Sequence, residues 1–360
     1  MTVSGSVYDF FLYAMVGFYV VALIRLAANW HKLKEARWLT IGAACWPVFM
    51  LDEWIRLAEA SSLAWSLGAT DVFGVMLLSC CYRFIKSMLI ITPSKRSRLF
   101  WPVGVTAVFQ LSILLMPLHE KSQWLVGSPI GEPLLLWPAY IPSLVAAFSI
   151  LLIGILVTEH IQLYHRYLPY QVVDVGEYKI PRLAGLLGST VGISFLNILL
   201  VTAAMFGFFT IPFWESLYHV LIGAVLLVVL LTLTSPRNTS PSPLDYDRFD
   251  KGEETPANIR QVLQQAEIAV INTKAYKDMG LTLQQFCVSN DIDPTLLAIA
   301  LQLERKQTFR SFIYKYRLDY AKNVLLNSDA KVARVAKRLG LDSEKFLSDF
   351  LVKHLRRGSR

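Results

Sequence analysis

The sequence predicts an all-α fold, in which a bundle of seven membrane-spanning helices precedes a separate helical domain. Hydrophobic residues fill 54% of the 360 positions and charged residues only 17%, whereas about a quarter of a soluble domain is charged. Residues 256–360 contain 18 Lys and Arg against 10 Asp and Glu, which accounts for the whole net charge of +8. After residue 258 apolar residues recur at helical spacing, without the alternation that is typical of strands.

Seven apolar stretches are long enough for a helix to cross a bilayer, which takes roughly 20 residues. The first stretch has no basic segment before it and is too long for a cleaved signal peptide, so we predict a spanning helix. The second and third contain charges, most of them near predicted helix ends, where long side chains reach the interface. The stretches are Val7–Ala28, Trp38–Ala58, Leu67–Thr92, Leu99–Leu118, Leu134–Val157, Leu183–Phe209 and Ser216–Thr234.

Basic residues in the loops predict the orientation of the bundle. Loops 29–37, 93–98 and 158–182 hold three Lys or Arg each, whereas on the other side there are only Arg56, near the end of the second stretch, and Lys121. Because cytoplasmic loops are enriched in basic residues, the N-terminus is expected outside and the C-terminus in the cytoplasm. Seven spans require the same parity. We therefore expect a multi-pass protein of the bacterial inner (cytoplasmic) membrane.

Composition also predicts the domain boundaries. Residues 1–234 form the transmembrane domain, and residues 259–360 form the cytoplasmic helical domain. Between them, residues 235–258 are rich in Pro, Ser and mixed charges and cannot build a packed core, so they are predicted to be a flexible linker. As a coil, this linker has a reach on the order of 25 Å.

Motifs in the cytoplasmic domain carry a family resemblance. The segment RLDYAKNVLL begins at Arg317, and VARVAKRLGL begins at Val332 and contains Gly340, which suits a tight turn. Upstream, LTLQQFCVSNDIDPTLLAIAL contains Asp293, a suitable N-cap, before Pro294. In these motifs residues 281–355 resemble the AraC/XylS family of transcription regulators. The resemblance implies two helix-turn-helix units joined by a long helix, and double-stranded DNA as a partner.

The resemblance also implies which residues contact DNA. On the first recognition helix, Thr295 and Ala298 are expected to face the groove, where they suit a thymine methyl group. On the second, Glu344, Lys345 and Asp349 are expected to face outward, and a carboxylate there accepts a hydrogen bond from cytosine. Asp349 replaces an arginine that is common in the family. The basic residues expected to contact phosphates are Arg305, Lys306, Arg334, Lys337, Arg338 and Lys353.

Ionisable residues gather at the predicted outer ends of the spans, with Arg56 among them. Such residues are costly inside a membrane and often mark function, which makes these positions candidates for a sensing site. Interfacial charges and aromatic belts occupy similar positions in most membrane proteins, so a purely structural role stays open. The candidates are Asp52, Glu53, Asp71, Glu215 and His219.

No enzyme chemistry is predicted, and no catalytic residue, metal site or cofactor is expected. Glu159, His160 and His165 lie close together but lack the HExxH spacing of a zinc protease. The four cysteines form neither a disulfide framework nor a zinc motif. The last span has no lysine to bind retinal.

These observations lead to two hypotheses about function. The first is a one-component transcription regulator in the membrane, whose expected partners are promoter DNA, the lipid bilayer and an unknown small-molecule or membrane-protein signal. A homodimer and contact with RNA polymerase are further expectations. The alternative is a membrane transporter or scaffold whose helical tail mediates protein–protein contacts.

Overall fold

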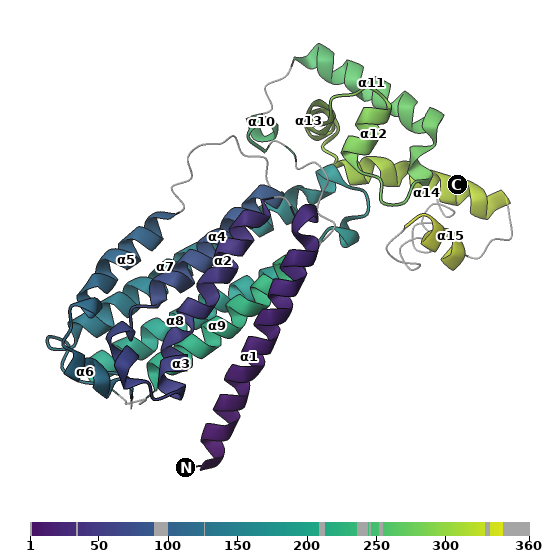
Figure 1. The fold of residues 1–360 in the computed structure, drawn as a ribbon. Helices are drawn as coiled ribbons and strands as arrows, with labels where there is room; N and C mark the ends of the chain where they lie inside the picture. The colour runs from purple at the N-terminus through teal and green to yellow at the C-terminus, as the bar shows by residue number, and fades with distance from the viewer. Residues whose placement is uncertain are drawn as a thin grey trace. The chain divides into compact units, whose positions relative to one another are not determined.

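The fold is all-helical, as predicted. A computed structural model of the chain describes residues 2–33, 35–89, 100–125, 127–208, 213–235, 244, 246–251, 255–327 and 332–340. Within these residues every regular element is a helix, and the β pairing is an isolated antiparallel bridge between Val172 and Thr282 (Figure 1). The chain divides into two compact units. The first comprises the described residues within Met1–Met88, Pro93–Gln162 and Ile180–Arg237.

Five helices are long and apolar enough to cross a membrane, which indicates a membrane protein. They overlap five of the seven predicted spans, although α7 continues past its predicted end at Val157 to Gln171. Each contains a continuous run of mostly apolar residues, and this local composition explains the membrane-length helix. The five are α1 (Thr2–Asn29), α4 (Asp71–Leu89), α7 (Trp137–Gln171), α8 (Pro181–Phe206) and α9 (Trp214–Leu233).

The other two predicted spans are not single long helices, so the structure does not confirm seven spanning helices. Trp38–Ala58 is divided into α2 (Ala36–Phe49) and α3 (Leu51–Leu57), which meet at Met50. Pro47 lies inside α2 and lacks the N–H that would continue the hydrogen-bond ladder. Helix α5 (Trp101–Leu114) has 14 residues, about 21 Å at 1.5 Å per residue, against a hydrocarbon core of about 30 Å.

Helix α9 packs against α1, α2, α3 and α8 in the first unit (Figure 1). Two glycines allow the junction between α2 and α3 to approach its neighbours. A Cβ atom on Gly223 would collide with Met50 Sδ, and one on Gly74 would lie 2.8 Å from the ring of Phe49. Trp46 Nε1 donates a hydrogen bond of 2.9 Å to the carbonyl of Gly223. This packing brings the charged residues of α3 beside the start of α9.

Short helices complete the first unit. A 3₁₀ helix follows α1, another lies between α3 and α4, and α6 lies between α5 and α7. The bounds are Trp30–Lys32 for η1, Ser61–Ser66 for η2 and Leu118–Gln123 for α6.

The second unit combines the C-terminal helices with the end of α7 and the connection after it. It includes Leu89, Leu163–Lys179 and the described residues within Asn238–Arg360. Besides the bridge between Val172 and Thr282, the amide of Val173 donates to the carbonyl of Leu281 at 3.1 Å. The elements are η4 (Val175–Glu177), α10 (Tyr246–Lys251), α11 (Pro256–Thr273), η5 (Ala275–Lys277), α12 (Leu283–Ser289), α13 (Pro294–Arg305), α14 (Phe309–Asn327) and α15 (Val332–Arg338).

Side-chain caps mark where α12 and α13 begin. Thr282 and Gln285 form a reciprocal capping box at the start of α12. Asp293 Oδ1 accepts hydrogen bonds from the amides of Thr295 at 2.8 Å and Leu296 at 3.2 Å. The predicted N-cap at Asp293 is therefore confirmed, and α13 follows α12 after a connection of four residues.

Two further features concern the C-terminal sequence motifs. Gly340 has a φ of +62°, and a Cβ atom there would lie 2.9 Å from Met279 Cε, so the predicted glycine turn is confirmed. Within the predicted linker, residues 246–251 form α10, and Phe249 of this helix is 2% exposed. Burial of that aromatic side chain explains why a segment predicted to be a coil contains a helix.

Candidate functional site

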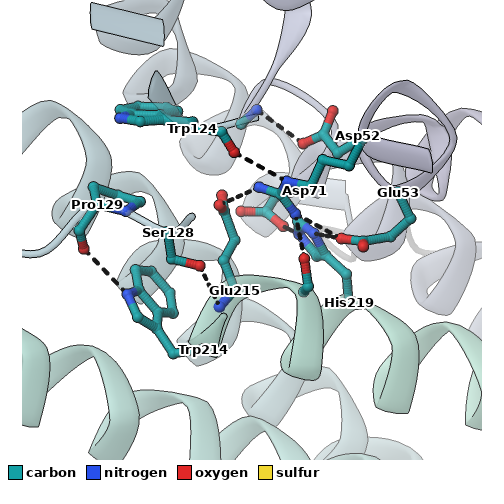
Figure 2. Close-up of polar contacts among 12 residues, drawn as sticks. Asp52, Glu53, Asp71, Trp124, Ser128, Pro129, Trp214, Glu215 and His219 are labelled. Atoms are coloured by element: carbon teal, nitrogen blue, oxygen red, sulfur yellow. Dashed lines mark hydrogen bonds and ion pairs between the residues drawn. The ribbon is translucent and has the colours of Figure 1, made fainter. Parts of the chain in front are cut away.

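The five residues predicted to sense a signal lie together in the first unit, with Arg56 among them (Figure 2). Helix α3 provides Asp52, Glu53 and Arg56, α4 provides Asp71, and α9 provides Glu215 and His219. None of these side chains is more than 10% exposed. We refer to these six residues as the buried polar cluster.

His219 bridges two carboxylates of the cluster. Its Nε2 lies 2.8 Å from Asp71 Oδ1, and its Nδ1 lies 3.3 Å from Glu53 Oε1. A neutral imidazole has one N–H donor and an ionised carboxylate has none. Both hydrogen bonds therefore require one proton more than the neutral ring carries, either on the ring or on a carboxyl group.

Arg56 holds α3 against α9. Its Nη1 donates to Glu53 Oε1 at 2.7 Å and to Ser216 Oγ at 2.8 Å, and its Nη2 donates to Glu215 Oε2 at 2.5 Å. Its Nε donates to the carbonyl of Trp124 at 3.4 Å. Because the guanidinium lies between two carboxylates, it neutralises part of the negative charge that these helices bury.

Three further residues that the sequence did not single out contact the cluster. The hydroxyl of Tyr8, on α1, donates to Glu53 Oε2. Ser128 Oγ accepts from the amide of Glu215 at 3.1 Å (Figure 2), and Asp52 Oδ2 accepts from the amide of Gly68 at 2.8 Å. Tyr, Ser and Gly are ordinary in apolar stretches, so their composition gave no signal.

The cluster contains more acids than bases. Four carboxyl groups face Arg56 and His219, and Asp52 Oδ1 is buried without a hydrogen-bond partner in the structure. The next cation is Lys121, which is 1% exposed and donates to the carbonyl of Trp65 at 2.5 Å. Burial lowers the pKa of Lys121, and the negative charge of Asp52 opposes this effect. Unbalanced buried charge is costly, so the cluster is suited to take up and release a proton.

Across the part of the chain that the structure describes, no group of three or more His, Cys, Asp or Glu side chains is placed to hold a metal ion. The contacts that exist are hydrogen bonds and ion pairs between protein groups.

The second candidate site is α13, the predicted first recognition helix. Thr295 is half-buried at its start, but Ala298 is 1% exposed. The predicted groove-facing position of Ala298 is therefore not observed. All residues from Leu297 to Leu301 are buried, because α10, α11, α12 and α14 all pack against α13. The residues of α13 that are not buried lie at its two ends, and those at the N-terminal end, 294–296, are only partly exposed.

The predicted phosphate contacts have different surroundings. Arg305 Nη2 pairs with Glu267 Oε1 of α11 at 2.7 Å. Lys306 is exposed and ends α13 with a φ of +50°. Three further basic residues are exposed on α15, namely Arg334, Lys337 and Arg338. Four predicted contacts lie outside the described residues, namely Glu344, Lys345, Asp349 and Lys353.

A buried ion pair joins the connection after α7 to the linking helix α14. Arg317 is 0% exposed, and its Nη1 and Nη2 lie 2.9 Å and 3.3 Å from the two carboxylate oxygens of Asp174. Asp174 Oδ2 also accepts from the amide of Gly280 at 2.7 Å. The sequence placed Arg317 in the linking helix, but nothing in it indicated Asp174.

Backbone carbonyls satisfy the remaining donors of Arg317. Its Nε donates to Tyr276 at 3.0 Å, its Nη1 to Leu339 at 2.9 Å, and its Nη2 to Asp278 at 2.7 Å. The first two of these segments precede α12 and follow α15, respectively. One side chain therefore links the segment before α12 to the turn after α15.

Comparison with protein-family models, with curated protein sequences and with solved structures finds no match for the chain.

Proposed function

We propose that the chain is a membrane-embedded one-component transcription regulator. Its first unit senses a signal in or across the membrane, and its C-terminal helices bind promoter DNA. The observation that carries the proposal is the capped pair α12 and α13, followed by α14 and α15, in one chain with five long apolar helices. The resemblance of residues 281–355 to the AraC/XylS family supports it.

The proposed topology has seven spans, with the N-terminus outside and the C-terminus in the cytoplasm of a bacterial cell. In this topology α2 and α3 together form one broken span and α5 forms a short span. Broken helices in membranes occur where the freed backbone groups and polar side chains face protein instead of lipid. The burial of Asp52 and Glu53 meets that condition.

The proposed DNA interface rests mainly on phosphate contacts. Arg334, Lys337 and Arg338 are exposed on α15 and suit this role, and they belong to the segment that carries the whole net charge. Thr295 remains a candidate for base contact, whereas Ala298 is left out because it is buried. The residues beyond 340 keep the roles that the family resemblance gives them.

The buried polar cluster is the proposed sensing site. Its excess of carboxyl groups and its single bridging histidine suit a change of protonation. A small molecule or a membrane protein that moves α3 relative to α9 would also act on the buried polar cluster. A homodimer and contact with RNA polymerase are further parts of the proposal.

Salt-dependent DNA binding by the full-length protein in lipid nanodiscs tests the proposal. The logarithm of affinity should fall with the logarithm of salt concentration by about 0.9 per phosphate contacted, and Arg334→Ala or Arg338→Ala should each reduce that slope by about one. Arg260→Ala is the control, since Arg260 is exposed on α11 and lies away from α15 in the sequence. Absence of binding at low salt would contradict DNA as a partner.

One observation favours the alternative of a transporter or scaffold with a protein-binding tail. The middle of α13, from Leu297 to Leu301, has no exposed side chain. A recognition helix needs a free face to enter a groove. If DNA binding fails, this burial and a partner protein for the helical domain become the leading explanation.

A further inference from the structure

Helix α10 lies against the start of the predicted recognition helix. It packs on α13 in the second unit (Figure 1). Arg248 Nη1 of α10 lies 3.3 Å from Asp293 Oδ2, and Asp293 is the N-cap of α13. The two side chains are 48% and 43% exposed, and exposed ion pairs contribute little to stability. This contact alone would not hold α10 in place.

The end of α7 provides the stronger attachment for α10. Phe249 is 2% exposed, and its ring meets the rings of Tyr167 and Tyr170 edge to face, with centroid separations of 5.5 Å and 5.0 Å. The hydroxyl of Tyr167 donates to Asp250 Oδ1 at 2.6 Å. Two aromatic contacts and a charge-assisted hydrogen bond therefore attach α10 to α7.

The position of α10 conflicts with access to DNA. In helix-turn-helix proteins the N-terminal residues of the recognition helix contact the bases. In α13 those residues follow Asp293 directly, and Arg248 of α10 is paired with it. Arg248 therefore lies at the end of α13 that a duplex would have to approach, where residues 294–296 are only partly exposed. The other end of α13 is paired with α11 through Arg305 and Glu267.

We propose that α10 is an autoinhibitory helix, which blocks the N-terminal end of α13 until its attachment to α7 is broken. This inference rests on the proposed DNA-binding function and adds its regulation. Helix α7 is continuous over 35 residues, and it belongs to the first unit up to Gln162 and to the second unit from Leu163. A rotation of α7 therefore moves Tyr167 and Tyr170 relative to Phe249, which provides a path from the membrane helices to α13.

The test measures DNA affinity of the full-length protein in nanodiscs with a fluorescent duplex of random sequence at low salt. Phe249→Ala removes the aromatic attachment, and Arg248→Ala removes the contact with Asp293. If the accessible form is a tenth or less of the population, release raises affinity by about tenfold or more. Arg248→Ala removes a positive charge, so electrostatics alone would weaken binding. Stronger binding by this variant can therefore be attributed to release.

Phe312→Ala is the matched control, because Phe312 is also a buried aromatic residue of the second unit and packs on Tyr316 of the same helix. It should not raise affinity, since a general loss of packing weakens binding. Hydrogen exchange of residues 246–251 reports release directly and should be faster in Phe249→Ala than in the parent protein. Arg248→Ala provides the second variant if Phe249→Ala does not fold.

Two outcomes separate this inference from the proposed function. If the parent protein binds DNA and both variants bind equally or more weakly while α10 exchanges faster, autoinhibition is overturned and the regulator proposal stands. If neither the parent protein nor any variant binds DNA at low salt, both are overturned. A gain in affinity for both variants and not for Phe312→Ala supports the inference.

Discussion

His219 Nε2 and Asp71 Oδ1 are 2.8 Å apart, although 148 positions separate the two residues in the chain. Their side chains are 1% and 6% exposed, so each provides a contact that water cannot replace. A buried polar group that loses its partner carries the full cost of desolvation. The pair therefore joins α4 to α9 through a contact that needs a proton on the ring nitrogen or on the carboxyl group.

Loss of the contact between His219 and Asp71 is expected to change how the protein responds to external pH. Because the two contacts of His219 need one proton more than the neutral ring carries, acid sensing is one version of the sensing hypothesis. Asp71→Asn and His219→Asn should flatten the pH dependence of target-gene expression, measured with a reporter, while protein abundance stays constant. His119→Asn is the control, since His119 is 77% exposed. An unchanged pH response in both cluster variants would return these residues to a structural role.

Loss of Arg56 is expected to destabilise the first unit. Arg56→Met leaves the buried carboxylates of Glu53 and Glu215 without their shared cation. Breaking a buried ion pair typically costs about 3–5 kcal/mol, and a lower melting temperature in detergent would report this loss. Arg25→Met is the control, because Arg25 is exposed and its hydrogen bond to Ser235 Oγ is long, at 3.4 Å. Equal melting temperatures for the two variants would contradict the prediction.

The second unit is expected to depend on Asp174. Asp174→Asn leaves the charge of Arg317 buried without its carboxylate and should cost about 3–5 kcal/mol in the unfolding of this unit. Hydrogen exchange at the amide of Gly280 would measure the change. Glu177→Gln removes an exposed carboxylate from the same connection and is the control. A fragment that begins at residue 255 lacks Asp174 and should show the same loss.

Cys287 is expected to be unreactive until the domain unfolds. Burial raises the pKa of its thiol to about 12, so little thiolate forms near neutral pH. Because the folded thiol keeps its proton above the pKa of an unfolded cysteine, its contribution to stability is constant below about pH 8.5 and falls as pH rises further. Labelling with a thiol reagent measures this reactivity in a variant whose only cysteine is Cys287. The control is a variant whose only cysteine is introduced by Val288→Cys, at a position 71% exposed, and it should react rapidly.

Reporter fusions test the orientation. Fusions after Gly127 and Thr210 should report the periplasm, and fusions after Lys95, Arg166 and Asn238 the cytoplasm, because the basic loops are expected inside. A periplasmic signal after Asn238 would remove the C-terminal helices from any contact with DNA. The fusions serve as controls for one another, because at least two of them test each side of the membrane.

The sequence predicted the long apolar helices well, because hydropathy over 20 residues is a local property. It did not predict the division between α2 and α3. That junction is stabilised by packing of Met50 and Phe49 against Gly223 and Gly74, which are distant in sequence. Pro47 favours a kink in α2, but a proline does not specify where the helix ends.

The buried polar cluster was predicted in part for a physical reason. A carboxyl group in an apolar stretch is costly, so Asp52, Glu53 and Asp71 stood out by composition alone. Tyr8, a further partner of Glu53, could not be found in this way, since it lies 45 positions away and tyrosine is common in membrane helices. Similarly, the burial of Ala298 depends on neighbouring helices that the motif itself does not specify.

The ion pair between Asp174 and Arg317 also has a consequence for biosynthesis. The two residues are 143 positions apart. At about 5–20 residues per second, roughly 7–30 s of translation separates them. Until Arg317 has been synthesised, Asp174 lacks its ion-pair partner. Val172 and Val173 are likewise synthesised before Thr282 and Leu281, with which they pair. Premature termination before α14 would therefore leave Asp174 without Arg317 and the second unit incomplete.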